Sequence, residues 1–185
     1  MTGVAVWSEG LIDPTLGRIR VWATETGIRR IDFENDGTAP RPGEMLSDGP
    51  PPSHLLDALT QLREYLAGRL RVFDLPLDLT HVTPFQHRVY ERLLRIPYGQ
   101  IATYGEVARD IGAEAGTARA VGGAVGANPI AMVVPCHRVV AADGKLVGFG
   151  GGLPRKAALL RLEGIEVDGA KPSSRVRPEV LRLPI

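Results

Sequence analysis

The chemistry of this chain centres on one cysteine, Cys136, which His137 follows directly. A thiol attacks carbon only as its thiolate, and its ordinary pKa of about 8.5 has to be lowered by a cation or a hydrogen bond. Adjacency in sequence does not supply that partner, because neighbouring side chains on a strand point to opposite faces. A small buried side chain followed by a surface histidine gives the same dipeptide. The surrounding residues must therefore decide between a nucleophile and a structural cysteine.

A single cysteine among 185 residues excludes an internal disulfide and a multi-cysteine zinc cluster. His54, His81 and His87 lack the spacing of metal ligands and are expected at the surface. We therefore expect no metal and no cofactor. A free thiol favours a reducing compartment, so a cytoplasmic location is expected.

The composition, with 44% hydrophobic and 23% charged residues, predicts one large globular domain or two small ones. No apolar run approaches the roughly 18 residues that a membrane span requires. The first residues, MTGVAVWSEG, lack the basic and apolar regions of a secretory signal. We expect a protein without a membrane segment and, by default, a monomer.

Charge is divided unevenly along the chain. Residues 1–80 carry 8 basic and 12 acidic side chains, whereas residues 81–185 carry 14 and 9. A modestly basic second half permits binding to nucleic acid. An unevenly charged but otherwise ordinary surface explains the same numbers equally well.

Residues 1–80 are expected to form a first domain that begins with strands. Hydrophobic residues alternate at period two, and a turn at Glu25-Thr26-Gly27 separates two of the runs. Pro, Gly and Asp predict a mobile loop over residues 35–52. Ser53 is expected to cap a helix with a leucine stripe that ends at Gly68. The predicted strands are Val4–Trp7, Ile19–Ala23, Ile28–Phe33 and a short one at Leu75–Leu79.

The second half starts with two helix signals of the same kind. Thr83-Pro84-Phe85-Gln86 and Thr103-Tyr104-Gly105-Glu106 are both capping boxes, and Pro97 and Gly99 separate the helices they open. A further helix is expected over Thr117–Ala127, after a glycine-containing turn. Two short helices joined in this way predict a helix-turn-helix.

The helix expected over Thr117–Ala127 is unusually rich in glycine. Gly122, Gly123 and Gly126 each cost about 1 kcal/mol relative to alanine in a helix interior. Tight packing against another helix is one explanation. Close approach to a DNA groove is the other, with Arg119 as the only long side chain available to enter it.

The remainder of the chain leads to and from the cysteine. Ile130–Val134 is expected to be a buried strand or loop, and Ala142-Asp143-Gly144 a turn that returns into a strand at Lys145–Phe149. A last helix is expected over Pro154–Glu163. Residues 81–168 would form the second domain, and residues 169–185 a loosely attached tail.

Four segments together resemble the O6-alkylguanine-DNA alkyltransferases. They read ATYGEVA, ARAVGGAVGANP, VPCHRVV and VGFGGGLPRKAALLRLEG, at consistent spacing over about residues 83–164. The first domain follows the family's pattern more loosely. The resemblance implies an α+β protein: a small N-terminal α/β domain with a short antiparallel sheet and a helix, then a mainly helical domain with the helix-turn-helix and the cysteine.

The resemblance also implies direct, single-turnover repair of double-stranded DNA. An O6-alkylguanine would be flipped out of the duplex, and its alkyl group would pass to Cys136. His137 would act through a water as the base, oriented by Glu163. Tyr104 would donate toward the guanine ring, and Arg119 would fill the gap left in the base stack.

The family's pocket and DNA contacts carry over residue by residue. Asn128 would hold the turn before the cysteine segment. The pocket would be shaped by Pro135, Val139, Phe149 and Gly150, and further DNA contacts would come from Thr103, Ala120 and Gly123. Some relatives have tyrosine at the position of Phe149 and serine at that of Gly150, so preference among alkyl groups, and for O4-alkylthymine, stays open.

Two other functions fit parts of the pattern. A catalytically silent DNA-damage-binding module of the same fold would lack the acceptor, but Cys136 is present. A cysteine hydrolase would need an oxyanion hole and would turn over many times.

Overall fold

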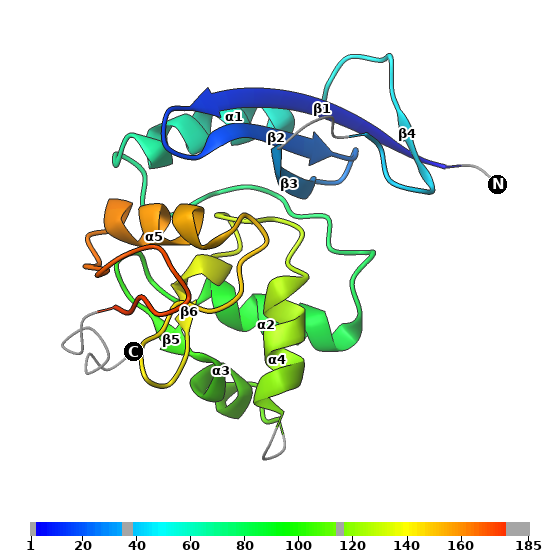
Figure 1. Ribbon diagram of the computed structural model, residues 1–185. Helices are drawn as coiled ribbons and strands as arrows, with labels where there is room; N and C mark the ends of the chain where they lie inside the picture. Colours follow the sequence, from blue (N-terminus) through cyan, green and yellow to red (C-terminus); the bar gives the residue numbers. More distant parts are fainter. Residues whose placement is uncertain (1–2, 35–38, 114–116, 177–185) are drawn as a thin grey trace. The chain divides into compact units, whose positions relative to one another are not determined.

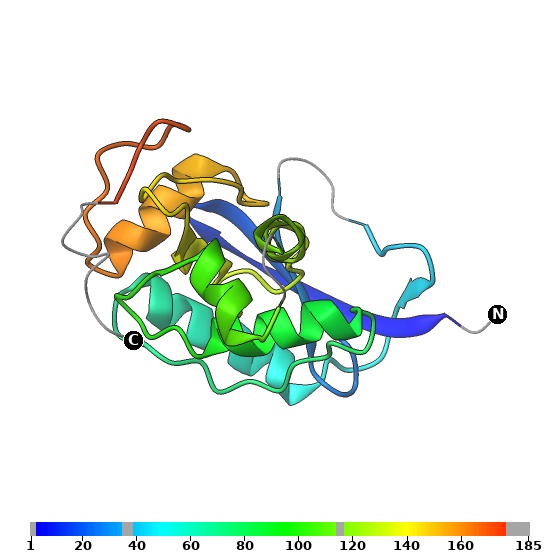
Figure 2. The ribbon, with the colours of Figure 1, turned by 90° about the horizontal axis from the view of Figure 1, so that it is seen from below.

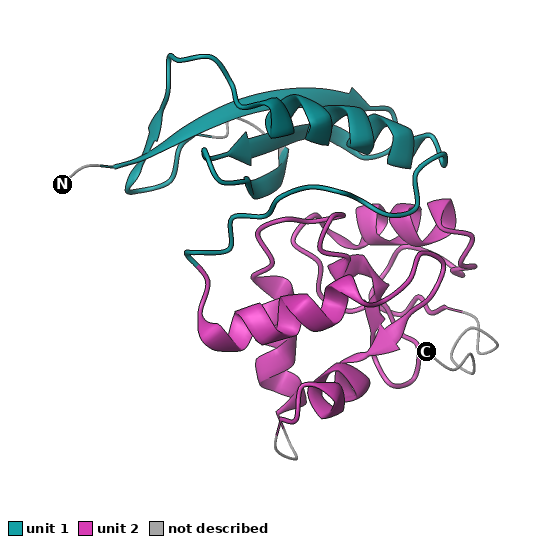
Figure 3. Ribbon diagram, turned by 180° about the vertical axis from the view of Figure 1, so that it is seen from behind, with its two compact units in different colours: residues 1–81 teal, residues 82–185 magenta. Residues whose placement is uncertain are grey.

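The computed structural model describes residues 3–34, 39–113 and 117–176. The chain divides into two compact units, residues 1–81 and 82–185 (Figure 3).

The N-terminal unit is built on a four-stranded sheet in the order β3-β2-β1-β4 (Figure 1). β1, β2 and β3 pair antiparallel, and β4 pairs parallel with β1. The period-two pattern of β2 places Ile19, Val21 and Ala23 in the core, as the sequence predicts. The strands span Val4–Asp13, Gly17–Ala23, Ile28–Glu34 and Glu44–Leu46.

The helix α1, Ser53–Leu66, packs on this sheet. Its leucine stripe is confirmed in Leu55, Leu59 and Leu62, which are buried, whereas Leu56 points to solvent. The expected cap at Ser53 is wrong: Pro52 holds the N-cap position without a side-chain hydrogen bond, and Ser53 is the first helical residue.

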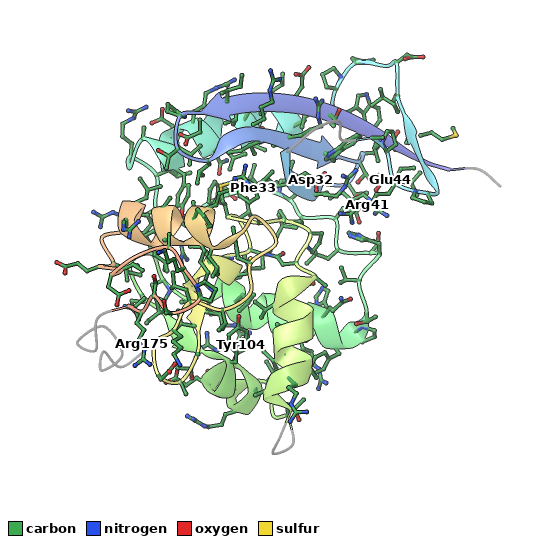
Figure 4. All side chains as sticks on the ribbon, in the orientation of Figure 1. Asp32, Phe33, Arg41, Glu44, Tyr104 and Arg175 are labelled. Atoms are coloured by element: carbon green, nitrogen blue, oxygen red, sulfur yellow. The ribbon has the colours of Figure 1, made fainter. Side chains whose placement is uncertain are left out.

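The segment expected as a mobile loop, residues 35–52, contains the strand β4; its residues 35–38 lie outside the described residues. Ion pairs to Glu44 stabilise the strand β4. The Glu44 carboxylate accepts hydrogen bonds from Arg29 at 3.1 Å and from Arg30 at 3.2 Å. Figure 4 shows Glu44 close to Asp32 and Arg41 at one end of the unit.

The strand expected at Leu75–Leu79 is reduced to a single bridge between Leu77 and Ile28. Pro76 explains the difference, because it lacks the N–H that a continued ladder requires. Its carbonyl still accepts a hydrogen bond from the Ile28 N–H.

The C-terminal unit opens with three helices, α2 (Pro84–Leu94), α3 (Tyr104–Asp110) and α4 (Ala118–Gly126). Both predicted capping boxes are confirmed, with Thr83 and Thr103 as N-caps. Figure 2 looks along the axis of α4, with α2 and α3 beside it. The predicted helix-turn-helix corresponds to α3 and α4, which contact each other.

The cysteine segment lies between these helices and the last one. A short 3₁₀ turn, η1 (Cys136–Arg138), leads into β6 (Val139–Val140), which pairs parallel with β5 (Ala102–Thr103). The helix α5 spans Leu153–Leu162 (Figure 1, orange). A hydrophobic cluster joins these parts: Ile101, Val140, Leu146, Ala157, Leu160, Ile165, Val167 and Val176.

Two expectations for this unit are wrong. Lys145–Phe149 does not return as a strand beside β6, because β6 takes β5 as its partner and Lys145 bridges to Arg175 instead. Residues 169–176 are not a loose tail. Val176 is only 3% exposed, since it fills the hydrophobic cluster beside Val167. Residues 177–185 lie outside the described residues.

Within the described ranges, no helix combines the length and the apolar character needed to cross a membrane.

Candidate active site

Cys136 is the first residue of the turn η1 and is 4% exposed. Its N–H donates to the Val134 carbonyl at 2.8 Å, and the Arg138 N–H donates to the Pro135 carbonyl at 3.0 Å. The alternation of a strand therefore does not apply here. The next residue, His137, is 0% exposed, so the alternative of a surface histidine is excluded.

His137 is held by the carboxylate of Glu163, which lies at the C-cap of α5. The two residues meet at 2.9 Å between Nε2 and Oε1. Because an ionised carboxylate can only accept, the proton of this hydrogen bond sits on Nε2 and Nδ1 remains as the basic nitrogen. Burial lowers the pKa of His137 below its usual value, with Glu163 acting in the opposite direction. His137 is therefore a neutral imidazole at pH 7.

Both carboxylate oxygens of Glu163 accept hydrogen bonds from further donors. Arg138 donates from Nε to Oε2 at 2.9 Å and from Nη2 to Oε1 at 2.8 Å, and the Gly99 N–H donates to Oε2 at 3.2 Å. Burial opposes the charge of Glu163, yet His137 and Arg138 hold its pKa at about 2. Glu163 is thus a fixed anion that orients His137 and does not take its proton. The role of Arg138 escaped the sequence analysis, although it directly follows His137.

Burial raises the pKa of the Cys136 thiol. The Asn128 side chain, the charge of Lys156 and nearby backbone N–H groups act against that rise. Asn128 also spans the preceding turn: its Nδ2 donates to the Val134 carbonyl at 2.8 Å, and its Oδ1 accepts from the Ile130 N–H at 3.1 Å. The resting sulfur is a protonated thiol, and it ionises only when a base removes the proton.

Tyr104, labelled in Figure 4, begins α3. Its hydroxyl donates to the Val147 carbonyl at 3.2 Å. Burial, and then the charge of Cys136, raise the pKa of Tyr104 to about 12, so the hydroxyl keeps its proton. The preceding residue, Thr103, uses its side chain to accept the Glu106 N–H and thereby caps α3.

Arg119, Ala120 and Gly123 lie on the exposed face of α4. A Cβ atom added at Gly123 or Gly126 would meet no described atom within 4 Å. Tight packing therefore does not account for these two glycines, whereas a Cβ at Gly122 would reach the Tyr104 ring at 3.9 Å.

The remaining predicted pocket residues fall into two groups. Pro135 and Val139 are buried on either side of η1. Phe149, which is partly buried, and Gly150, which is exposed, lie in the loop formed by residues 147–152, here called the substrate loop. Tyr104 contacts this loop through Val147.

Lys156 is a residue that the sequence analysis missed. It lies on α5, is 0% exposed, and donates from Nζ to the Val139 carbonyl at 2.6 Å and to the Val147 carbonyl at 2.7 Å. It precedes Glu163 by seven residues, so both lie on one face of the helix, two turns apart. A lysine seven residues before Glu163, followed by the apolar run Ala157–Leu160, is the signal that could have identified it.

Comparison with known proteins identifies the family. Residues 84–165 match the DNA-binding domain of 6-O-methylguanine DNA methyltransferase, and residues 8–79 match its ribonuclease-like domain. The methylated-DNA–protein-cysteine methyltransferase of Mycobacterium tuberculosis is 57% identical over 114 residues, which are 62% of this chain and 68% of that protein. That of Salmonella typhimurium is 51% identical over 104 residues, covering 56% and 60%.

Solved structures agree. The crystal structure of the Mycobacterium tuberculosis protein in complex with DNA has a TM-score of 0.73 at 42% identity, covering 86% of this chain and 92% of the other. The O6-methylguanine-DNA methyltransferase of Pyrococcus kodakaraensis has a TM-score of 0.53 at 25% identity, covering 86% and 99%. The chain belongs to the O6-methylguanine DNA methyltransferase family.

Proposed function

We propose that this chain repairs alkylated double-stranded DNA by direct reversal, moving the alkyl group of O6-alkylguanine onto Cys136 once per molecule. The observation that carries the proposal is the buried hydrogen bond between His137 and Glu163, with His137 directly following the single cysteine. Membership of the family and the DNA complex of the Mycobacterium tuberculosis protein support it.

The transfer is an in-line displacement in which His137, through a water molecule, accepts the thiol proton. The sulfur of Cys136 then forms a bond to the alkyl carbon, and the carbon–O6 bond breaks with its electron pair left on guanine. Tyr104 donates a hydrogen bond to the ring as this charge develops, and guanine finally takes up the proton that His137 accepted, which leaves the imidazole neutral again. Alignment of sulfur and carbon at about 3–3.5 Å supplies much of the rate. The thioether is stable, so the protein is consumed.

The exposed face of α4 is assigned to the DNA groove. Its glycines leave the helix backbone uncovered by side chains, which allows α4 to approach the DNA closely. Arg119 is the long side chain available to occupy the gap in the base stack. Unstacking a base costs a few kcal/mol, which an inserted side chain offsets. Because lesions occur in any sequence, contacts to phosphates and groove shape dominate over base-edge recognition.

The pocket assignments carry over from the family resemblance. In this proposal Asn128, Pro135 and Val139 shape the pocket beside η1, and Phe149 and Gly150 contribute from the substrate loop. Without hydroxyls at Phe149 and Gly150, any hydrogen bond to O6 comes from a backbone N–H. We also propose that the chain acts as a monomer in the cytoplasm, where thiols stay reduced.

The test is mass spectrometry of the intact protein after incubation with duplex DNA that contains O6-methylguanine. We expect one added methyl group, on Cys136, and none in Cys136→Ala. Repair of an excess of DNA by a small amount of protein would favour a hydrolase. Tight binding of the lesion without an adduct would favour a silent damage-binding module.

A further inference from the structure

Lys156 is a buried charge that the chemistry above does not use. Its side chain is fully shielded from solvent on α5, and both of its hydrogen bonds go to neutral backbone carbonyls, those of Val139 and Val147. Among the ion pairs of residues 3–34, 39–113 and 117–176, none involves Lys156. The ammonium is therefore buried without a carboxylate.

A buried ammonium without a carboxylate lowers the stability of the fold, so a purely structural role does not explain it. Removing an ammonium from water costs several kcal/mol, and two carbonyls offset only part of that cost. A methionine of similar length would fill the space without the penalty. A partner that becomes negative during the reaction would compensate this cation. The Cys136 sulfur is such a partner: Lys156 donates to the carbonyl of Val139, three residues after Cys136, and each of the two groups favours the charged form of the other.

We propose that Lys156 is a positioning residue for the alkyl transfer, in which its buried ammonium is the fixed counter-charge of the Cys136 sulfur and ties the substrate loop to the strand that follows this cysteine. The proposal rests on the function proposed above. It concerns a state of the sulfur that can also be measured without DNA.

The hydrogen bonds of Lys156 give it a second effect on the pocket. The Val147 carbonyl accepts from both Lys156 and Tyr104. The other carbonyl belongs to Val139, three residues after Cys136. One ammonium thus links the cysteine segment, the substrate loop and, through Val147, the tyrosine that faces the guanine.

The charge balance changes in the course of the reaction. When the thiol proton leaves for His137, the sulfur becomes negative and Lys156 is compensated. When the sulfur–carbon bond forms, the negative charge passes to guanine, where the proton that His137 accepted neutralises it. The reacted protein therefore retains a buried ammonium beside a neutral thioether. Burial already lowers the pKa of Lys156 to about 8, against the raising effect of Cys136. Alkylation removes that effect, so this pKa falls further.

The first experiment is a titration of the thiolate by its ultraviolet absorbance. Cys136 is the only cysteine of the chain, and Cys136→Ser supplies the blank. We expect Lys156→Met to raise the thiol pKa by about one unit or more, a tenfold change in ionisation, and Lys156→Arg to retain at least half of the effect. An unchanged pKa in Lys156→Met would overturn the proposal, because a space-filling role predicts no shift.

The second experiment uses the wild-type chain, so it remains decisive if the methionine variant does not fold. The chain has three lysines, Lys145, Lys156 and Lys171, and their ¹³Cε resonances are followed against pH by NMR. After Cys136 is methylated with iodomethane, the Lys156 titration should move to lower pH, while those of Lys171, which is exposed, and Lys145, which is half-buried and paired with Asp143, stay in place. Equal titration before and after methylation would refute the proposal. Since no DNA is used, either result is independent of repair activity.

Discussion

Glu163 accepts hydrogen bonds from His137, Arg138 and Gly99, and this number of donors decides what its loss should do. We expect Glu163→Gln to reduce the free energy of unfolding by about 3–5 kcal/mol, because Arg138 is left as an uncompensated buried charge. Urea denaturation measures this change. The exposed Glu166, changed to Gln, is the matched control and should alter stability little.

The same substitution should change the pH dependence of alkyl transfer. Glu163 raises the pKa of His137, so its removal lowers that pKa further. In Glu163→Gln the acidic limb of the rate profile should therefore move to lower pH, with a smaller maximal rate because the imidazole is a weaker base. Rates of transfer from O6-methylguanine DNA between pH 4 and 8 measure the shift. A profile of unchanged shape would remove Glu163 from the proposed relay.

Arg119 offers a test of base flipping at the level of one side chain. Arg119→Ala should slow repair of duplex DNA by about one to two orders of magnitude, because unstacking a base costs a few kcal/mol. Transfer from the free modified base needs no flipping and should be nearly unchanged. Arg109→Ala, which removes an exposed arginine from α3, controls for the loss of charge. Equal losses with both substrates would exclude the proposed role of Arg119.

At the scale of elements, α4 combines poor helix propensity with an exposed, glycine-bearing face. Gly123→Ala should raise the free energy of unfolding by about 1 kcal/mol, because the added methyl meets no described atom. The same methyl should weaken binding to duplex DNA if the backbone of α4 approaches the groove closely. Thermal unfolding and a DNA-binding titration measure the two effects.

Gly126→Ala is the matched control for this prediction. Gly126 is equally open but is the last helical residue of α4, so its substitution should affect DNA binding less. Stabilisation by Gly123→Ala with no loss of DNA affinity would show that this face does not meet the DNA.

Elements whose signals are local could be predicted from the sequence. The capping boxes at Thr83 and Thr103 fix the starts of α2 and α3 within four residues, and both are present. Elements held by distant partners could not. The strand β4 depends on ion pairs from Glu44 to Arg29 and Arg30, and the segment 169–176 depends on Val176 filling a cluster built from other elements.

At the scale of the whole molecule, several buried charges make stability depend on pH. Burial opposes the charge of Asp78, yet Thr80, Arg29 and Thr24 hold its pKa at about 2, and the pKa of Glu163 is equally low. Since the unfolded chain binds these protons more readily, both carboxylates stabilise the fold above pH 4.5 and lose that effect as pH falls toward about 2. His137, with its lowered pKa, adds a loss that begins near pH 6.5. Urea unfolding at pH 7, 5.5 and 3.5 should show a stepwise decrease, and constant stability would contradict these assignments.

The site was predictable to the extent that motifs carry it. The PCHR segment marks Cys136 and its neighbour, and the resemblance supplies Glu163 and Tyr104 as expectations. The spacing of Lys156 from Glu163 gave a signal, but the contributions of Arg138 and Lys156 depend on how completely each side chain is buried and on which carbonyls it meets. A sequence shows that a residue is charged, whereas only the fold shows that the charge is enclosed.

The seven-residue interval between Lys156 and Glu163 means that α5 sets the distance between these two charged side chains. The interval corresponds to about 10.5 Å along the helix axis and almost two complete turns, so the cation and the anion lie on the same face of the helix. Adding a single alanine between Ala158 and Leu159 would rotate Glu163 by about 100° about the helix axis relative to Lys156, while leaving the composition of the helix nearly unchanged. Such an insertion would separate Lys156 from Glu163 without replacing any side chain of the helix.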